Sequence, residues 1–290
     1  MAQFLDLSIH HELLRAFLRE DAGAGDITTD TIVPATQRAH GQVVAKGPLV
    51  LAGIELCLEV FRLLDPVTEV HVTRRDGSEL EAGEIPALAN ASARALLTGE
   101  RVALNLLQRM SGVATLTRSF VRAVEGTGAK ILDTRKTTPG LRALEKYAVR
   151  VGGGHNHRNH LGEAVLIKEN HIRLAGNISR ALAAAETVRN QVAWIEIEVT
   201  NLDELRAALS HTPDVILLDN MRPLLIRQAV EQVRRCDPVR KIRMEASGGI
   251  TLENVRQYAD AGVDWISIGA LTHSAPAVDL SFEIALNSLL

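Results

Sequence analysis

Apolar residues recur along the second half of the chain in a rhythm that predicts alternating strands and helices. Six short runs, mostly apolar and β-branched, predict strands at 130–133, 164–168, 193–199, 214–219, 241–246 and 264–269. Each run is nearly continuous, as expected for parallel strands that are buried on both faces. Amphipathic stretches between them predict helices at 141–151, 178–190, 202–209, 224–235 and 252–261. The alternation predicts an α/β domain with a parallel sheet.

The sequence shows six βα units, whereas a complete α/β barrel has eight. An open doubly wound sheet is one alternative. An incomplete α/β barrel fits better, because candidate site residues follow every strand, whereas a doubly wound sheet gathers its ligands at one switch point.

The first half of the chain has a different pattern, which predicts a separate α+β domain. Helices are expected at 11–21, closed by Gly23, and at 54–64. Strands are expected at 41–46 and 67–73, followed by a turn at Asp76 and Gly77. A long helical pattern runs from Thr98 to Glu125, with a break expected near Ser111 and Gly112. We expect the domain boundary within this stretch, so that 1–115 precede it and 116–273 follow it.

Charged residues stand at or near the carboxyl ends of five successive expected strands. In a parallel barrel these ends converge on one mouth, where catalytic residues lie. A single charge at such a position is usually a solvated rim residue. Five in succession favour a shared polar pocket, because burying isolated charges inside apolar runs costs several kcal/mol.

The charged residues of this predicted pocket form two groups. The cationic group suits carboxylates and phosphates. The acidic group suits a hydroxylated sugar or magnesium, a hard cation that prefers oxygen ligands. The cationic members are Arg135, Lys136, Lys168 and the loop residue Arg158, and the acidic members are Glu198 and Asp219, with Glu245 as a further candidate.

Glycines end the last two expected strands, at Ser247-Gly248-Gly249 and at Gly269-Ala270. Glycine lets backbone N–H groups approach a phosphate, and barrels often bind phosphate at this place. A tight βα turn is the alternative for either segment alone.

The segment from Gly152 to His160 contains three glycines and then His155, His157 and His160. The histidine spacing matches none of the usual zinc patterns. The glycines instead indicate a ligand-contacting loop in which His157 and Arg158 contact an anion.

Composition and charge narrow the classes of function. The formal net charge is −3, without the basic surplus of a nucleic-acid-binding protein. No uninterrupted apolar run approaches the roughly 20 residues of a membrane span. The two cysteines have neither metal-site nor disulfide-framework spacing. We therefore expect a soluble, cytoplasmic protein without nucleic acid or membrane partners.

Six motifs carry a resemblance to a known family. They are GDITT at 25–29, GERVALN at 99–105, DTRKTTPG at 133–140, GGGHNHR at 152–158, LIKENH at 166–171 and GALTHS at 269–274. In this combination and order the chain resembles the quinolinate phosphoribosyltransferase family, in register over nearly its whole length. Two positions depart from the family pattern: Thr200 stands where relatives often have an acid, and Gly162-Glu163 where Ser-Asp is frequent.

The resemblance implies a fold, a reaction and an assembly. The fold is an N-terminal open-faced α/β sandwich (1–115), joined by the tail 274–290, and an incomplete α/β barrel (116–273). The reaction is decarboxylating transfer from phosphoribosyl pyrophosphate (PRPP) to quinolinate, which gives nicotinate mononucleotide for NAD synthesis, with magnesium as cofactor. The assembly is a homodimer in which Arg101 completes the partner's site.

The resemblance also implies a role for each site residue. The carboxylates of quinolinate would be held by Arg101, Arg135, Lys136, His157, Arg158 and Lys168. The ribose hydroxyls and magnesium would be contacted by Glu198 and Asp219. Phosphate would be held by Ser247, Gly248 and Gly249 and by Ile268, Gly269 and Ala270. Thr134 is a further substrate contact, and the residues expected to act in catalysis are Lys136, Lys168, Glu198 and Asp219.

Three alternative functions remain. The same transfer to nicotinate or another acceptor is the nearest, although a dicarboxylate accounts better for the surplus of cations. A barrel aldolase or isomerase would use Lys168 as a Schiff-base lysine. A phosphate-ligand sensor would bind PRPP and release no pyrophosphate.

Overall fold

The computed structural model describes residues 6–239 and 241–286, which form two compact units. The first comprises the described residues of Met1–Leu116, Arg150–Gly152 and Ala275–Leu290. The second comprises Thr117–Val149 and the described residues of Gly153–Ser274. The division at Leu116 and the boundary expected after residue 115 both lie within helix α4 (Ala93–Ala123).

The second unit contains a sheet of six strands, all parallel. The strands are β6 (Lys130–Leu132), β7 (Val165–Ile167), β8 (Ile195–Val199), β9 (Val215–Asp219), β10 (Arg243–Ser247) and β11 (Trp265–Ser267). Their order is β6-β11-β10-β9-β8-β7, so β6 and β7 are the two edges. This is the order of a barrel that is open between β6 and β7, which confirms the predicted incomplete barrel.

The glycine-rich loop lies along the open edge at β6. The His155 N–H donates to the Ile131 carbonyl at 2.8 Å, and the Asp133 N–H donates to the His155 carbonyl at 3.1 Å. Gly154 has no room for a side chain, because an added Cβ would lie 2.8 Å from both Thr117 and Val149. The loop thereby brings His157 and Arg158 beside the end of β6.

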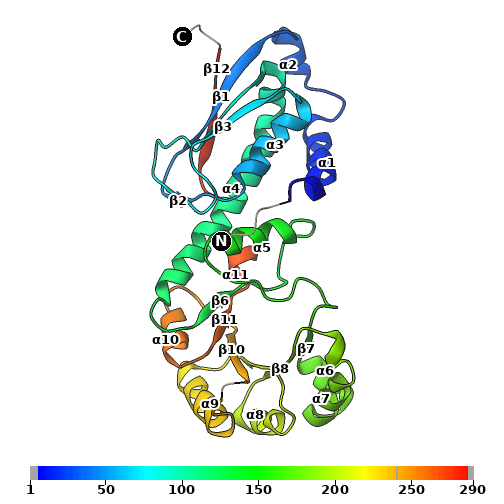
Figure 1. Ribbon diagram of the computed structural model, residues 1–290, viewed down its shortest axis with the longest axis vertical. Coiled ribbons are helices and arrows are strands. Elements are labelled where there is room, and N and C mark those ends of the chain that lie inside the picture. Colours follow the sequence, from blue (N-terminus) through cyan, green and yellow to red (C-terminus); the bar gives the residue numbers. More distant parts are fainter. Residues whose placement is uncertain (1–5, 240, 287–290) are drawn as a thin grey trace. The chain divides into compact units, whose positions relative to one another are not determined.

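Helices follow the strands and cover their outer side, as Figure 1 shows for α7, α8 and α9. The helices of this unit are α5 (Arg142–Val151), α6 (Glu169–Ala175), α7 (Ile178–Glu186), α8 (Leu202–Leu209), α9 (Pro223–Cys236), α10 (Val255–Asp260) and α11 (Ala270–His273), with the 3₁₀ helix η2 (Arg189–Gln191). Local sequence sets several helix starts. The Asn177 side chain caps α7, and the Asn201 side chain caps α8 by accepting from the Asp203 and Glu204 N–H groups.

The first unit is built on a four-stranded antiparallel sheet of order β12-β1-β5-β3. Its strands are β1 (Arg38–Ala45), β3 (Glu69–Val72), β5 (Ala87–Ser92) and β12 (Leu280–Leu286), and a small second sheet pairs β2 (Leu49–Val50) with β4 (Glu79–Leu80). Its helices are η1 (Ser8–His10), α1 (His11–Ala22), α2 (Ile27–Ile32), α3 (Ile54–Leu64) and α4. Phe61 of α3 stacks on Phe282 of β12 with ring centroids 4.9 Å apart, so α3 packs on the sheet. The C-terminal strand therefore completes the N-terminal sandwich.

The break expected in the long helix near Ser111 and Gly112 was wrong, because α4 is continuous. These residues instead serve packing within the first unit. The Ser111 hydroxyl accepts a hydrogen bond from the Ala52 N–H at 3.0 Å. A Cβ on Gly112 would lie 2.0 Å from the Pro276 carbonyl oxygen, so only glycine fits there.

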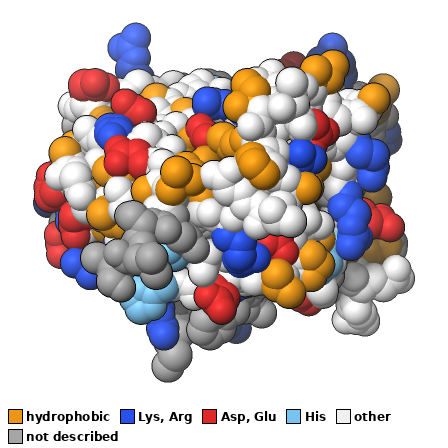
Figure 2. Space-filling model, turned by 90° about the horizontal axis from the view of Figure 1, so that it is seen from above, with side chains coloured by type: hydrophobic (Ala, Val, Ile, Leu, Met, Phe, Trp, Pro, Cys, Tyr) orange, Lys and Arg blue, Asp and Glu red, His pale blue; other side chains and the backbone are white. Residues whose placement is uncertain are grey.

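The surface shows no segregation of charge on the face that is drawn. On the face drawn in Figure 2, acidic and basic side chains are interspersed rather than segregated by sign. Among the described residues, no helix combines the length and the apolar character needed to cross a bilayer.

Candidate active site

A buried ion pair anchors the segment that follows β6. Asp133 is fully buried, and its Oδ1 lies 2.5 Å from the Nζ of Lys146 on α5. The same carboxylate accepts hydrogen bonds from the Asn156 side chain and the His157 N–H. Lys146 also donates to the His157 carbonyl at 2.8 Å. One carboxylate and one ammonium therefore hold the end of β6 and the His157 loop together.

The pKa shifts of this pair report its burial. Burial raises the pKa of Asp133, although the neighbouring Lys146 opposes the shift. Burial likewise lowers the pKa of Lys146, against the attraction of Asp133. Burial thus disfavours both charged forms and the attraction between them opposes it, so loss of either member would leave a buried charge without its counter-ion.

The side chain of His157 is engaged at both ring nitrogens. Nε2 lies 3.0 Å from Glu196 Oε2 and 3.5 Å from Glu245 Oε2, and Nδ1 lies 2.9 Å from the Arg158 backbone N–H. Trp194 donates to Glu196 at 3.0 Å and meets the His157 ring edge to face. Burial would lower the pKa of His157, but the two carboxylates outweigh it and raise this pKa to about 10.

The strand ends surround one pocket of about 530 Å³. Eleven of the residues expected in the site line it: Thr134, Arg135, Lys136, His157, Arg158, Lys168, Glu198, Asp219, Ser247, Gly248 and Gly249. These residues come from both edges and from the middle of the sheet. The pocket therefore has the location that the barrel prediction gave it, at the carboxyl ends of the strands.

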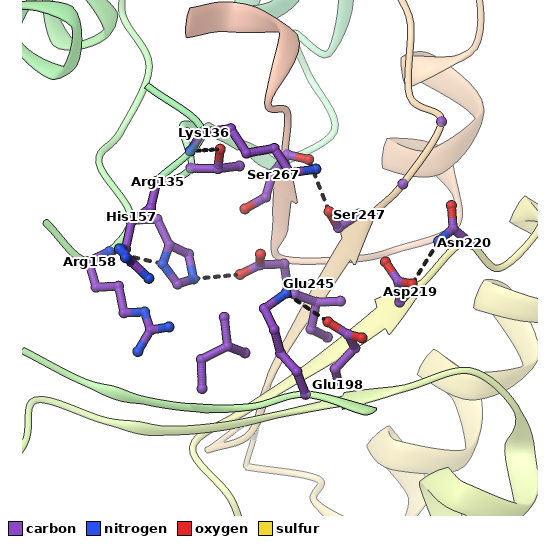
Figure 3. A pocket seen from close by; sticks show the side chains of 16 residues that line it. Arg135, Lys136, His157, Arg158, Glu198, Asp219, Asn220, Glu245, Ser247 and Ser267 are labelled. Carbon is purple, nitrogen blue, oxygen red and sulfur yellow. Dashed lines mark hydrogen bonds and ion pairs between the residues drawn. The ribbon is translucent and has the colours of Figure 1, made fainter. Parts of the chain in front are cut away.

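Cations gather on one side of the pocket. Figure 3 shows Arg135, His157 and Arg158 together on that side, opposite Asp219 and Asn220. The Arg158 guanidinium is tied to the wall by Nη1, which donates to the Ala164 carbonyl at 2.7 Å. Burial lowers the pKa of Arg158, and the charge of Arg135 lowers it further. The two positively charged guanidinium groups repel each other, so an anion bound between or beside them is favoured.

Acidic residues line the other part of the pocket. Glu198 is paired with Lys168, with Nζ and Oε2 3.0 Å apart. Asp219 accepts a hydrogen bond from the Asn220 side chain at 2.7 Å. Both side chains supply carboxylate oxygens, the donor type that magnesium prefers.

The glycine turn after β10 packs closely on the end of β9. A Cβ on Gly248 would lie 2.2 Å from Asn220 Oδ1, and Gly248 has a φ of 95°. Asn220 itself has a positive φ of 52°, and its N–H donates to the Ser247 carbonyl at 2.9 Å. This packing explains why a glycine follows Ser247, and it exposes backbone at the pocket.

Four expected site residues do not line the pocket. Arg101 lies on α4 in the first unit, and its side chain is 60% exposed. Ile268, Gly269 and Ala270 follow β11, but the Ile268 N–H donates to the Leu132 carbonyl and is not available to a phosphate. Gly269 leaves room for the side chain of Lys136. A Cβ added to Gly269 would lie 2.9 Å from the Lys136 Cδ, which is too close.

Glu245, the further acidic candidate, also lines the pocket, whereas four other lining residues were not among the expected ones: Leu166, Leu217, Asn220 and Ser267. Asn220 follows Asp219 directly, and Glu245 had been noted as a further acid, so both carried a signal in the sequence. Ser267 ends a strand, as the other lining residues do. The two leucines look like any other residue of an apolar strand.

The two departures from the family pattern both have local partners. Thr200 holds the carboxylate of Glu204 through its N–H at 2.8 Å and its hydroxyl at 3.0 Å. Glu204 and Glu198 line a neighbouring hollow together, so an acid still stands beside Glu198. Glu163 accepts from the backbone N–H of Asn159, and this bond, first among several causes, lowers the pKa of Glu163.

Comparison with known families identifies both halves of the chain. Residues 26–111 match the family model "Quinolinate phosphoribosyl transferase, N-terminal domain", and residues 113–283 match "Quinolinate phosphoribosyl transferase, C-terminal domain". The chain belongs to the quinolinate phosphoribosyltransferase family. This confirms the resemblance that the six motifs carried.

Individual members of the family are similar over almost the full length. A probable nicotinate-nucleotide pyrophosphorylase (carboxylating) of Bacillus subtilis (strain 168) is 43% identical over 277 residues, or 96% of this chain and 94% of the relative. The nicotinate-nucleotide pyrophosphorylase (carboxylating) of Mycobacterium leprae (strain TN) is 44% identical over 276 residues, or 94% of this chain and 96% of the relative. The crystal structure of NadC from Streptococcus pyogenes superposes with a TM-score of 0.92 at 37% identity, covering 98% of this chain and 99% of that one.

Proposed function

We infer that this quinolinate phosphoribosyltransferase family member transfers the phosphoribosyl group of PRPP to quinolinate. The products are nicotinate mononucleotide, carbon dioxide and pyrophosphate, which makes this a step of de novo NAD biosynthesis. The observation that carries the inference is the division of one pocket into a cationic side and an acidic side. Quinolinate is a dianion, and PRPP presents ribose hydroxyls and phosphates.

The cationic side suits the two carboxylates of quinolinate. We assign them to Arg135, Lys136, Arg158 and Lys168, with His157 shaping the wall between. Guanidinium groups bind carboxylates through two parallel hydrogen bonds, which fixes the ring nitrogen toward the sugar. A monocarboxylate such as nicotinate would leave part of this positive charge without a partner.

The acidic side suits the sugar. As the bond to pyrophosphate loosens, the ribose resembles an oxocarbenium ion, and the carboxylates of Glu198 and Asp219 stabilise that positive charge. Gly248 and Gly249 line the pocket with positive φ angles, and their backbone N–H groups suit a phosphate of PRPP.

We propose magnesium as the cofactor, held by Glu198 and Asp219. The fit rests on two carboxylates that line the same pocket, neither of them sealed off from it. When bound, magnesium neutralises negative charge on the pyrophosphate group. Lys168, paired with Glu198, sets the local charge balance where quinolinate and PRPP meet.

Decarboxylation follows from the cation that transfer creates. Attack on the sugar leaves the pyridine nitrogen positive, and this nitrogen withdraws electrons from the adjacent ring carbon. The neighbouring carboxylate leaves as carbon dioxide, while the other stays bound to the arginines. The pocket must therefore orient both carboxylates without over-stabilising the one that departs.

The function is tested by a mass-resolved assay with quinolinate, PRPP and magnesium, run beside the same reaction with nicotinate. We expect nicotinate mononucleotide from quinolinate alone, with one carbon dioxide per turnover, and loss of the reaction when a chelator removes magnesium. Product from nicotinate would transfer the assignment to that acceptor. Binding of PRPP without release of pyrophosphate would indicate a sensor instead.

We propose that the chain forms a homodimer in which Arg101 serves the partner's pocket. Its support is the exposed side chain of Arg101 and its absence from the residues that line the pocket of its own chain. Mixing inactive R101A with inactive D219N should restore activity, because one site of each mixed dimer is intact. Random exchange should recover about a quarter of wild-type activity. Mixtures that stay inactive after subunit exchange would show that Arg101 does not act in the partner's pocket.

An aldolase or isomerase that uses Lys168 as a Schiff-base lysine has less support. Lys168 is ion-paired with Glu198 and its side chain is half exposed, whereas a Schiff-base lysine is typically desolvated in an apolar pocket. The cytoplasmic location expected from the sequence remains part of the proposal, and the two free cysteines agree with it.

A further inference from the structure

Glu245 is a buried carboxyl group at the pocket with no role in the assignments above. It lies on β10 with 1% of its surface exposed, yet it lines the pocket. Among the described residues, neither of its oxygens has a hydrogen-bond partner. Figure 3 shows it between His157 on one side and Glu198 and Asp219 on the other. An ionised carboxylate that is buried without hydrogen-bond donors destabilises the folded protein, unless the group carries a proton or contacts a ligand.

The surroundings of Glu245 favour the protonated form. The nearby ring nitrogen of His157 lies closer to Glu196, at 3.0 Å, than to Glu245, at 3.5 Å. That nitrogen has one N–H, which the closer Glu196 accepts, so Glu245 keeps only the longer ion-pair contact with His157. Burial raises the pKa of Glu245 and the charge of Glu196 raises it further, and together these outweigh His157 and Ser267, which lower it.

The reaction needs a proton at this place. When carbon dioxide leaves, the bond between the ring carbon and the carboxylate breaks, and the electron pair stays on the ring carbon beside the cationic nitrogen. A proton must then form the new C–H bond. Resting on the proposed function, we propose that Glu245 is the general acid that donates this proton, with His157 and Glu196 as the groups that position it.

The step balances within the pocket. The O–H bond of Glu245 breaks as the C–H bond forms, and the glutamate is left as a carboxylate. His157 Nε2, 3.5 Å from Oε2, then faces that new charge. A proton from water restores the acid when product leaves. Two other possible donors are engaged elsewhere: Lys168 pairs with Glu198, and Asp133 with Lys146.

The test is E245Q, which keeps the size of the side chain but cannot give a proton to carbon. General acid catalysis typically contributes about 10²–10⁴-fold, so kcat should fall by roughly that factor. The KM values for quinolinate and PRPP should stay within about threefold, since binding is not the altered step. The matched control is E253Q, an exposed glutamate after the same strand, which should behave as wild type.

A second readout separates donation from positioning. In an equimolar mixture of H₂O and D₂O, the hydrogen-to-deuterium ratio at the new C–H bond of the product reports the proton donor. We expect E245Q to change that ratio relative to wild type. A variant with reduced kcat but an unchanged ratio would show that Glu245 only positions other groups, and a kcat within about twofold of wild type would also overturn the proposal.

E245D covers the case in which E245Q fails to fold. The aspartate side chain of this variant is one methylene shorter, so its carboxyl group lies farther from the ring carbon and kcat should fall at least about tenfold. Because the proton donor is still a carboxyl group, the isotope ratio should equal that of wild type. An unchanged kcat in a folded E245D would contradict the proposal. Wild-type enzyme in the same assay distinguishes failure of the proposed function from failure of the Glu245 proposal. If wild-type enzyme makes no nicotinate mononucleotide, the proposed function is wrong. If wild-type enzyme is active and E245Q behaves in the same way, only the role of Glu245 is wrong.

Discussion

Lys146→Met is expected to lower the free energy of unfolding by about 3–5 kcal/mol, because it leaves the buried Asp133 carboxylate without its counter-ion. Asp133 and Lys146 are both almost fully buried, and their charged atoms lie 2.5 Å apart. The measurement is denaturant unfolding, in which the midpoint should fall at an unchanged slope. Activity should also fall, since the same pair holds the Arg135 segment and the His157 loop.

Two further variants test the physical reason. The double variant D133N/K146M removes both charges and should recover much of the lost stability, because no isolated charge is left. R235M removes an arginine from an exposed ion pair with Glu231 on α9 and should change stability by less than about 0.5 kcal/mol. If K146M unfolded at the same denaturant concentration as R235M, the pair would not be a structural anchor.

Arg135→Ala should lower kcat/KM for quinolinate by roughly 10- to 150-fold. The reason is loss of a charge-assisted contact with a carboxylate, about 1.5–3 kcal/mol, with each 1.4 kcal/mol equal to a factor of ten. Arg135 lines the pocket, and its Nε is buried with no hydrogen-bond partner among the described residues. Stability should change little, because among the described residues the Arg135 guanidinium has no hydrogen bond or ion pair to lose.

The control for Arg135 separates charge from geometry. R135K keeps the charge but not the planar fork, so it should recover only part of the activity. The KM for PRPP should change much less than that for quinolinate in both variants. Steady-state kinetics with each substrate varied in turn would show this, and unaltered kinetics for quinolinate in R135A would mean that the carboxylates bind elsewhere.

Local patterns were sufficient for the elements of the barrel. The helix at 202–209 and the helix at 54–64 have the bounds that their apolar spacing predicts. Each strand of the barrel lies within its predicted range or extends it by one residue, since a strand buried on both faces must be a continuous apolar run. Charges at the ends of such runs then indicated the pocket, because isolated buried charges are too costly to occur by chance.

Long-range packing was harder to anticipate. Gly112 looks like a helix break in sequence, yet it allows the close approach of Pro276, more than 160 residues away. In the segment predicted to hold phosphate, the Ile268 N–H donates to the Leu132 carbonyl of the neighbouring strand β6, and the phosphate role of Gly269 and Ala270 stays a prediction. In both cases the partner is distant in sequence, so no local pattern could show it.

The sequence by itself determined the family, the order of the βα units and most of the residues that line the pocket. It did so because periodicity, strand-end charge and long motifs are local properties of the chain. Only the tertiary structure decided that Asp133 is sealed by Lys146, that both nitrogens of His157 are engaged, and that Glu245 is buried at the pocket without a hydrogen bond. Burial and partner distance set the charge state of each of these groups, and both arise only when strands far apart in sequence are brought together.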